Sequence, residues 1–279
     1  MTRLTPDTIS GVSHILSDYD LELQKKTGYS LKGLSLLASG LSETEFTLRS
    51  QNSLFCVVPI SSGQGIISGF SETVLEIITF LGCRAQLAST PDISGFAEAF
   101  RARADFIFCA DDNDFVSLIP YPQSVVHNDQ ATAKGYVTAL TLHARHRSGK
   151  VLVLGCGPVG QAALTELIEA DFQVDVYDPD TARVEAWYRN LCPRKNLTRV
   201  LSSFPRKLDA YVGVLDATPA LDIIDPRQVH QDLLIAAPGV PLGLSPEALR
   251  QLQDQIIHDP LQLGVAVMVC MSLTLNREA

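Results

Sequence analysis

The 279-residue sequence has few charged side chains (19%) and few aromatic ones (7%), and it lacks the patterns of several protein classes. Its 22 Lys+Arg against 31 Asp+Glu give a formal net charge of −9, with no basic run longer than Lys25-Lys26. Because nucleic acids and anionic lipid surfaces are bound through basic faces, this balance argues against both partners. No apolar run reaches the roughly 20 residues that a membrane-spanning helix needs, so no membrane association is expected.

The cysteines are isolated from one another, and the sequence contains no C-x-x-C pair. Neither a zinc site nor a disulfide framework is therefore indicated, and buried, reduced thiols are expected. Thr5-Pro6-Asp7 stands where a secretory signal would carry its apolar stretch. These absences predict a cytoplasmic protein with no metal centre. The cysteines are Cys56, Cys83, Cys109, Cys156, Cys192 and Cys270.

Short apolar runs alternate with amphipathic stretches along the chain, which predicts an α/β fold with open, mostly parallel sheets. At roughly 150 residues per domain, the length favours two domains. We place the hinge at Ser148-Gly149-Lys150. Residues 1–148 then hold an N-terminal helix, an α/β domain and a linking helix, and residues 149–279 hold a second α/β domain.

The expected elements follow from the periodicity of the apolar residues. In the first domain we expect strands at residues 54–58, 85–88 and 106–109, and helices at 6–28, 71–82, 95–103 and 129–147. In the second we expect strands at 151–154, 173–177, 210–215, 233–236 and 255–257, and helices at 161–170 and 181–189. Residues 29–50 show no clear period.

Gly155-Cys156-Gly157-Pro158-Val159-Gly160 is a G-x-G-x-x-G motif. The motif alone is weak, but here it directly follows an apolar strand and opens a helix, as a dinucleotide-binding Rossmann domain requires. Gly155 would make the tight turn, Gly157 would let the backbone approach a pyrophosphate, and Gly160 would let the helix pack closely on the strand. Pro158 and Val159 begin that helix, whose positive end favours phosphate.

An acidic residue about 20 positions after the motif is the second feature of such a domain. Asp178 lies 23 residues after Gly155 (178 − 155) and follows the next expected strand. A carboxylate there would accept hydrogen bonds from the adenosine ribose and repel a 2′-phosphate. The first basic residue beyond it is Arg183, so NAD is favoured over NADP as the cofactor. A glycine turn that binds nothing is the alternative.

Two later loops follow strands of the same expected sheet, and ligands bind outside the carboxyl ends of such strands. The first loop contains Ala217, Thr218 and Pro219, and the second contains Pro238 and Gly239. We expect both loops on the nicotinamide side of the cofactor. Ordinary turn chemistry would produce the same residues.

Two polar loops in the first domain are candidates for holding a substrate. Ser61 and Ser62 follow one buried strand, and Asp111-Asp112-Asn113-Asp114 follows another. Adjacent carboxylates repel one another unless a cation or solvent relieves them, which suits a cationic, amine-bearing substrate. A solvated turn is an equally good interpretation. Asn128, at the start of the linking helix, could hydrogen-bond a ligand, whereas neighbouring His127 fits a solvated loop equally well.

The chain resembles the pyrrolysine synthase family from Leu4-Thr5-Pro6 to Pro260-Leu261. The motifs of the first domain are the most specific, because a general dehydrogenase would share only the glycine loop. The motifs of the first domain are Pro59-Ile60-Ser61-Ser62-Gly63-Gln64-Gly65-Ile66-Ile67, Phe70-Ser71-Glu72, Pro91-Asp92-Ile93-Ser94-Gly95 and Ala110-Asp111-Asp112-Asn113 with Phe115. The second domain adds Ala217-Thr218-Pro219 and Pro238-Gly239-Val240-Pro241.

The resemblance implies an N-terminal substrate domain, a C-terminal Rossmann domain and an active site in the cleft. It implies oxidation by NAD of the terminal amine of L-lysine-Nε-(3R)-methyl-D-ornithine, a dipeptide-like small molecule, followed by ammonia loss and closure of the pyrroline ring. Asp111 then corresponds to the catalytic acid near the reacting amine, which it would position and whose proton it would accept. Leu4 corresponds to a helix that closes on substrate. Ser61, Ser62, Ala110, Asp112 and Asn128 correspond to substrate-binding positions.

Two other functions share many of these features. One is an NAD-dependent dehydrogenase of another amine or amino acid, which would use the same glycine loop and acidic loop. The other is an NAD-sensing protein that binds the nucleotide without turnover. The sequence leaves both functions open, and it is compatible with a homodimer.

Overall fold

The computed structural model describes residues 5, 9, 11–63, 67–145, 147, 149–190 and 198–276. The chain forms two compact units: unit 1 comprises residues 3–135 and 261–279, and unit 2 comprises residues 136–260. This division differs from the expected hinge at Ser148-Gly149-Lys150 in two respects. The units part within helix α7 (Asn128–Ala144), and the C-terminal segment returns to unit 1. Leu4, Gln64, Gly65 and Cys192 lie outside the described residues.

Unit 1 contains a five-stranded sheet in the order β2-β1-β3-β4-β5. Three strands are parallel: β1 (Phe55–Val57), β2 (Ala85–Leu87) and β3 (Phe106–Ala110). The antiparallel strands β4 (Phe115–Ile119) and β5 (Ser124–His127) extend the sheet. The expected parallel strands are therefore present, and β4 and β5 are two further strands that the sequence pattern did not indicate.

The helices of unit 1 include the expected ones and three others. α2 (Val12–Thr27), α5 (Phe70–Phe80) and α6 (Asp92–Arg101) correspond to predicted helices. α3 (Leu31–Ser39) and α4 (Glu43–Gln51) occupy the stretch that showed no period, and α11 (Gln262–Leu275) is the C-terminal helix. Ser42 and Glu45 form a capping box that begins α4, a signal that the sequence does carry.

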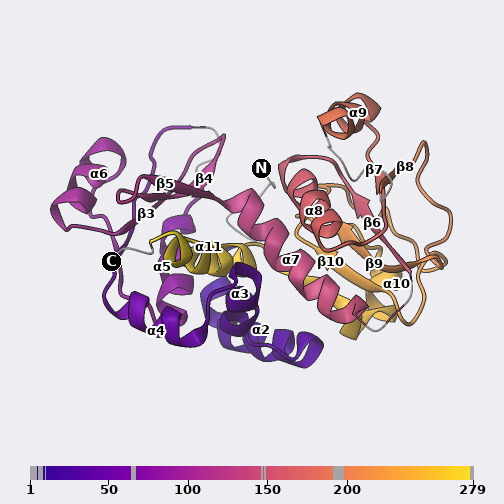
Figure 1. Cartoon of the computed structure of the whole chain (residues 1–279), viewed down its shortest axis with the longest axis horizontal. Helices are drawn as coiled ribbons and strands as arrows, with labels where there is room; N and C mark the ends of the chain where they lie inside the picture. The colour runs from indigo at the N-terminus through magenta and orange to yellow at the C-terminus, as the bar shows by residue number, and fades with distance from the viewer. Residues whose placement is uncertain are drawn as a thin grey trace. The chain divides into compact units, whose positions relative to one another are not determined.

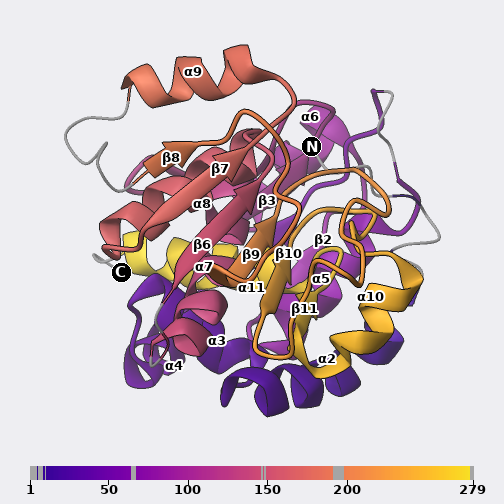
Figure 2. The same ribbon diagram turned by 90° about the vertical axis from the view of Figure 1, so that its right-hand side faces the viewer.

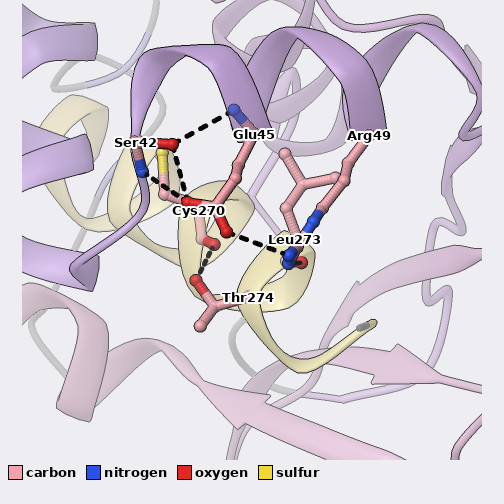
Figure 3. Close-up of polar contacts among 6 residues, drawn as sticks. All are labelled: Ser42, Glu45, Arg49, Cys270, Leu273 and Thr274. Atoms are coloured by element: carbon pink, nitrogen blue, oxygen red, sulfur yellow. Dashed lines mark hydrogen bonds and ion pairs between the residues drawn. The ribbon is translucent and has the colours of Figure 1, made fainter. Parts of the chain in front are cut away.

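Helix α11 lies within unit 1, where it packs against α3, α4, α5, β4 and β5 (Figure 1). Nearly all its side chains are buried, so it has no polar face and needs neighbours on every side. Figure 3 shows how α4 contacts the last turn of α11. Arg49 of α4 donates from Nη1 to the Leu273 carbonyl at 2.7 Å, and its Nη2 contacts Glu45. The Arg49 guanidinium supplies a donor to a carbonyl that has no partner within α11, and its positive charge interacts favourably with the negative C-terminal end of the α11 dipole.

Unit 2 is built on a six-stranded parallel sheet in the order β11-β10-β9-β6-β7-β8 (Figure 2). This is the 3-2-1-4-5-6 order of a Rossmann domain, in which the strand order reverses between the first and fourth strands, here β6 and β9. The Rossmann prediction is therefore confirmed, with β8 as a strand that the sequence analysis missed. The strands are β6 (Lys150–Leu154), β7 (Val174–Tyr177), β8 (Thr198–Val200), β9 (Tyr211–Asp216), β10 (Leu234–Ala237) and β11 (Ile256–His258).

Helices cover both faces of this sheet because successive strand residues point to opposite sides. α8 (Pro158–Glu169) packs on β6, β7 and β9, and Leu140 of α7 lies against Gly213 on β9. On the other face, Leu152 and Val214 join a buried cluster that includes Ala248 of α10 (Pro246–Gln251). The short helix η2 (Gln253–Gln255) and α9 (Thr181–Asn190) complete the unit.

No helix in the described part of the chain is long and apolar enough to cross a membrane. The same residues contain no group of three or more His, Cys, Asp or Glu side chains that could hold a metal ion. The cysteines described are all free thiols, and all but the half-buried Cys109 are buried.

Candidate active site

The glycine loop of unit 2 joins β6 to α8 at the point where the strand order reverses. Gly155 has a φ of +87°, a conformation that glycine adopts without strain. A Cβ on Gly160 would lie 2.0 Å from the Gly155 carbonyl oxygen, so only glycine allows α8 to begin this close to the strand. The sequence-based roles of these two glycines therefore match the local geometry.

Gly157 differs from the other two glycines because the protein's own packing does not require it. It caps α8 with an ordinary φ of −75°, and a Cβ built on it would meet nothing within 4 Å. No side chain caps this helix, and Pro158 occupies its first turn. The open space in front of the helix N-terminus suits a phosphate group, since backbone N–H groups and the helix dipole face it.

Asp178 follows β7 and is buried, with 6% of its surface exposed. Its Oδ2 accepts a hydrogen bond from the Cys156 N–H at 2.7 Å, and its Oδ1 accepts one from the Asp180 N–H at 2.8 Å. The carboxylate therefore braces the glycine loop, a second role that the sequence analysis did not assign. Burial and this nearby carboxylate raise the pKa of the Cys156 thiol to about 11, so the thiol is neutral at physiological pH.

Arg183 lies beside this carboxylate. Its Nη1 is 3.7 Å from Asp178 Oδ2, and its Nη2 is 3.3 Å from Asp180 Oδ2. About half of the Arg183 side chain is exposed. Arg183 follows Asp178 by five positions in the sequence, and the first turn of α9 brings its guanidinium to the Asp178 carboxylate.

The two later loops pack against each other beyond β9 and β10. The Gly239 N–H donates to the Asp216 carbonyl at 3.0 Å, and a Cβ on Gly239 would lie 2.2 Å from the Thr218 carbonyl oxygen. Ala217 lies against the glycine loop, because its carbonyl oxygen would be 3.0 Å from a Cβ on Gly155. The structure thus brings Ala217, Thr218 and Gly239 to the carboxyl edge of the sheet. Pro219 and Pro238 flank them in the same loops.

The candidate substrate residues of unit 1 lie in loops that follow its parallel strands. Parallel strands end at the same edge of a sheet, and the loops after β1, β2 and β3 meet there. The Ser61 N–H donates to Asp92 Oδ1 at 2.9 Å, and its hydroxyl donates to Asp92 Oδ2. Asp112 lies against Gly63, with Oδ1 2.9 Å from the position of a Gly63 Cβ. We call these loops, residues 58–63, 88–92 and 111–114, the acidic edge.

Asp111 shapes the turn between β3 and β4. Its Oδ1 accepts hydrogen bonds from the N–H groups of Asn113 and Asp114 at 2.8 and 2.9 Å. These bonds hold the pKa of the exposed Asp111 carboxyl below its usual range. The carboxylate is therefore anionic at neutral pH and better suited to hold a cation than to accept its proton. Ala110 ends β3 and places Asp111 at the edge.

His127 and Asn128 have contacts of their own. His127 Nδ1 lies 3.0 Å from Asp114 Oδ2, which links the end of β5 to the acidic edge. Asn128 begins α7, and its Nδ2 lies 3.2 Å from the sulfur of Met268 on α11. Asn128 therefore helps to seat the first turn of α7 on α11, a contact that the sequence analysis did not foresee.

Asp92 is an acidic residue of the acidic edge that was not expected to belong to the site. Hydrogen bonds from Ser61 lower the pKa of its carboxyl, so Asp92 adds negative charge to the acidic edge. The signal was present in the sequence, because Asp92 follows Pro91 directly after the expected strand. Ser62 is exposed in the same loop as Ser61, and Leu4 lies outside the described residues.

Comparison with known proteins links these observations to one family. The family model described as "Pyrrolysine biosynthesis protein PylD, N-terminal domain" matches residues 8–121. Pyrrolysine synthase of Methanosarcina barkeri (strain Fusaro / DSM 804) is 28% identical over 269 residues, which cover 96% of this chain and 97% of that protein. Pyrrolysine synthase of Methanosarcina acetivorans is also 28% identical over 269 residues, which cover 96% of this chain and 98% of that protein.

Solved structures share the fold. Shikimate dehydrogenase of Aquifex aeolicus is similar with a TM-score of 0.51 and 13% identity, over 77% of this chain and 88% of that one. Shikimate 5-dehydrogenase of Thermus thermophilus, solved in complex with NADP(H) and shikimate, has a TM-score of 0.51 and 14% identity, over 80% of this chain and 92% of that one. At these identities the likeness establishes the dehydrogenase fold and no finer property.

Proposed function

We propose that this chain is an NAD-dependent pyrrolysine synthase. The match of residues 8–121 to the PylD N-terminal family model, the 28% identity to two pyrrolysine synthases over 96% of the chain, and the fold shared with the dehydrogenases above support this proposal. Its proposed substrate is L-lysine-Nε-(3R)-methyl-D-ornithine, whose terminal amine is oxidised. NAD would supply the oxidant, taking a hydride from the amine-bearing carbon. The resulting imine carbon would be attacked by the α-amine of the same methylornithine moiety, and loss of ammonia would close the pyrroline ring.

The observation that supports the cofactor is the open space at Gly157 in an otherwise tightly packed glycine loop. The pyrophosphate would lie there, against the first turn of α8, with Val159 and Gly160 supplying backbone N–H groups. Asp178 would accept hydrogen bonds from the ribose while bracing the loop through Cys156. The loops that contain Thr218 and Gly239 lie over the other half of the sheet, where the nicotinamide half would bind.

The acidic edge of unit 1 supports an amine-bearing substrate. An alkyl ammonium has a pKa near 10.4 and is cationic at neutral pH. Asp111 and Asp112 would hold that charge, and Ser61, Ser62 and Ala110 would line the same edge. Asp111 would orient the amine for hydride transfer, which is a contribution of position and charge. The lowered pKa makes this carboxylate a weaker base, which favours position and charge as its main contribution.

A turnover assay tests the proposed function. We expect NADH absorbance to rise when the protein is mixed with NAD and lysine-Nε-methylornithine, with one ammonia released per NADH. NADH formation with ornithine or alanine but not with the lysine conjugate would instead show a dehydrogenase of another amine. NAD binding without turnover of any of these amines would show a nucleotide-sensing protein. Either result would overturn the proposal.

Asp178→Asn tests the cofactor preference. The amide keeps one oxygen to accept the Cys156 N–H but loses the charge that repels a 2′-phosphate, and it frees Arg183 to pair with that phosphate. We expect NAD binding to weaken by about 1–3 kcal/mol and the preference for NAD over NADP to narrow. Titration of both nucleotides against the wild type and the variant measures this. In the control Asp209→Asn, which changes an exposed carboxylate that pairs with Lys207 ahead of β9, the preference should stay within about twofold. Equal wild-type affinity for both nucleotides would contradict this role of Asp178.

A further inference from the structure

Asp216 is a completely buried carboxyl at the end of β9, in the strand that follows the reversal of strand order in unit 2. It pairs in register with Leu154, the residue directly before the glycine loop. Its Oδ1 accepts two bonds from Thr218, one from the N–H at 3.1 Å and one from the hydroxyl at 2.7 Å. The first of the later loops is therefore folded around this carboxyl.

The other oxygen of Asp216 faces the second loop. Oδ2 is buried with no hydrogen bond of ordinary geometry from a described residue, and a Cβ on Gly243 would lie 2.2 Å from it. The backbone carbonyl of Asp216 also accepts the Gly239 N–H at 3.0 Å. Asp216 thus contacts both loops. Its side chain contacts Thr218 in the first loop, and its side chain and backbone contact Gly243 and Gly239 in the second.

The second loop has a further support at its start. His258 ends β11, and its Nδ1 lies 2.7 Å from the carbonyl oxygen of Ala237, the last residue of β10. Burial raises the pKa of Asp216, and the bonds from Thr218, the approach of the Gly243 amide and nearby His258 oppose that rise. Burying a carboxyl here carries a desolvation cost in folding free energy, and an apolar residue of similar size would avoid that cost.

We propose that Asp216 is a positioning residue for the nicotinamide half of the dinucleotide, holding loop 216–219 and loop 238–243 in the relative position that receives it. The proposal rests on the proposed function, since it needs NAD to bind along this sheet edge. In a Rossmann domain, one mononucleotide-binding half carries the adenosine and the other carries the nicotinamide. Asp216 lies in the second half, so its loss should affect the two parts of the cofactor unequally.

The test compares NADH with AMP, which occupies only the adenosine half. For Asp216→Ala we expect NADH affinity to fall about tenfold or more while AMP affinity stays within about twofold of wild type. Asp216→Asn keeps one acceptor oxygen for Thr218 and should restore most of the NADH affinity. The control is Asp175→Asn, which changes another buried carboxyl, held by Tyr211 and Lys150 at the opposite end of the strands, and should leave both affinities within about twofold.

Thr218→Val provides a second route if Asp216→Ala does not fold. It removes the hydroxyl that donates to Asp216 and that accepts a long bond from the Ala220 N–H at 3.4 Å, while the Thr218 N–H bond to Asp216 remains. We expect a two- to fivefold loss of NADH affinity with AMP binding unchanged. A parallel loss of NADH and AMP affinity, or no loss of either, would overturn the positioning role. A wild type that binds neither nucleotide would instead overturn the proposed function itself.

Discussion

Asp111→Asn is expected to lower the turnover of the lysine–methylornithine substrate roughly 100-fold or more, with NAD affinity unchanged. The amide keeps an oxygen that can accept the N–H groups of Asn113 and Asp114, so the turn should persist. What disappears is the negative charge that would hold the substrate ammonium for hydride transfer. Steady-state kinetics with varied substrate and varied NAD would measure both effects.

The matched control for this variant is Asp225→Asn in unit 2. Asp225 is also an exposed turn carboxylate that accepts the N–H of a residue two positions on, and hydrogen bonds from Arg227 lower its pKa. Because Asp225 lies outside both candidate sites, its variant should retain wild-type turnover. Unchanged turnover in Asp111→Asn would return the acidic edge to the solvated-turn interpretation, and Ser62 and Asn128 would become the next positions to change.

The sequence predicted the parts of the fold whose pattern is local. β6, β7, β9 and β10 are mostly apolar because parallel strands are buried on both faces, and α8 follows a glycine motif with a known geometry. Helix α11 was missed for the opposite reason. It is buried on all sides, so its sequence shows no amphipathic period. Its burial is explained only by its packing against α3, α4 and α5, which the sequence pattern does not show.

The antiparallel strands β4 and β5 pair with sequence neighbours across short turns, but the apolar pattern of β4 is interrupted by a residue whose burial depends on a distant contact. Ser117 of β4 is completely buried and bonds Ser272 of α11 at 2.8 Å, 155 residues along the chain. A serine at that position breaks the apolar pattern that a buried strand would show. The domain boundary depends on the same distant contacts, because the chain segment that contains Ser272 returns to unit 1.

The candidate sites show a similar limit. Spacing alone placed Asp178 one strand after the glycine motif, but it could not show that Asp178 also braces Cys156 or that Arg183 lies beside it. On unit 1 the sequence identified Ser61 and Asp112 as loop residues. Their contacts with Asp92 and Gly63 bring three separate loops together, and this follows only from the parallel pairing of β1, β2 and β3.

Gly157→Ala should separate cofactor binding from folding more clearly than any other single change. A methyl group at this position meets no protein atom within 4 Å and needs no change of φ, so thermal stability should be the same as in wild type. The methyl would occupy the space that the pyrophosphate needs. We expect an overpacking cost of about 1–3 kcal/mol in NAD binding, which is roughly a 5- to 150-fold loss of affinity.

Two other glycines make this result decisive. Gly160→Ala puts a methyl 2.0 Å from the Gly155 carbonyl oxygen, so it should lower both thermal stability and NAD affinity. Gly11→Ala changes the glycine that caps α2 in unit 1, where a Cβ also meets nothing within 4 Å, and it should alter neither. Calorimetry of NAD binding together with thermal unfolding distinguishes the three variants. If Gly157→Ala binds NAD as tightly as wild type does, the pyrophosphate does not approach the first turn of α8, and the assignment of the dinucleotide to this loop fails.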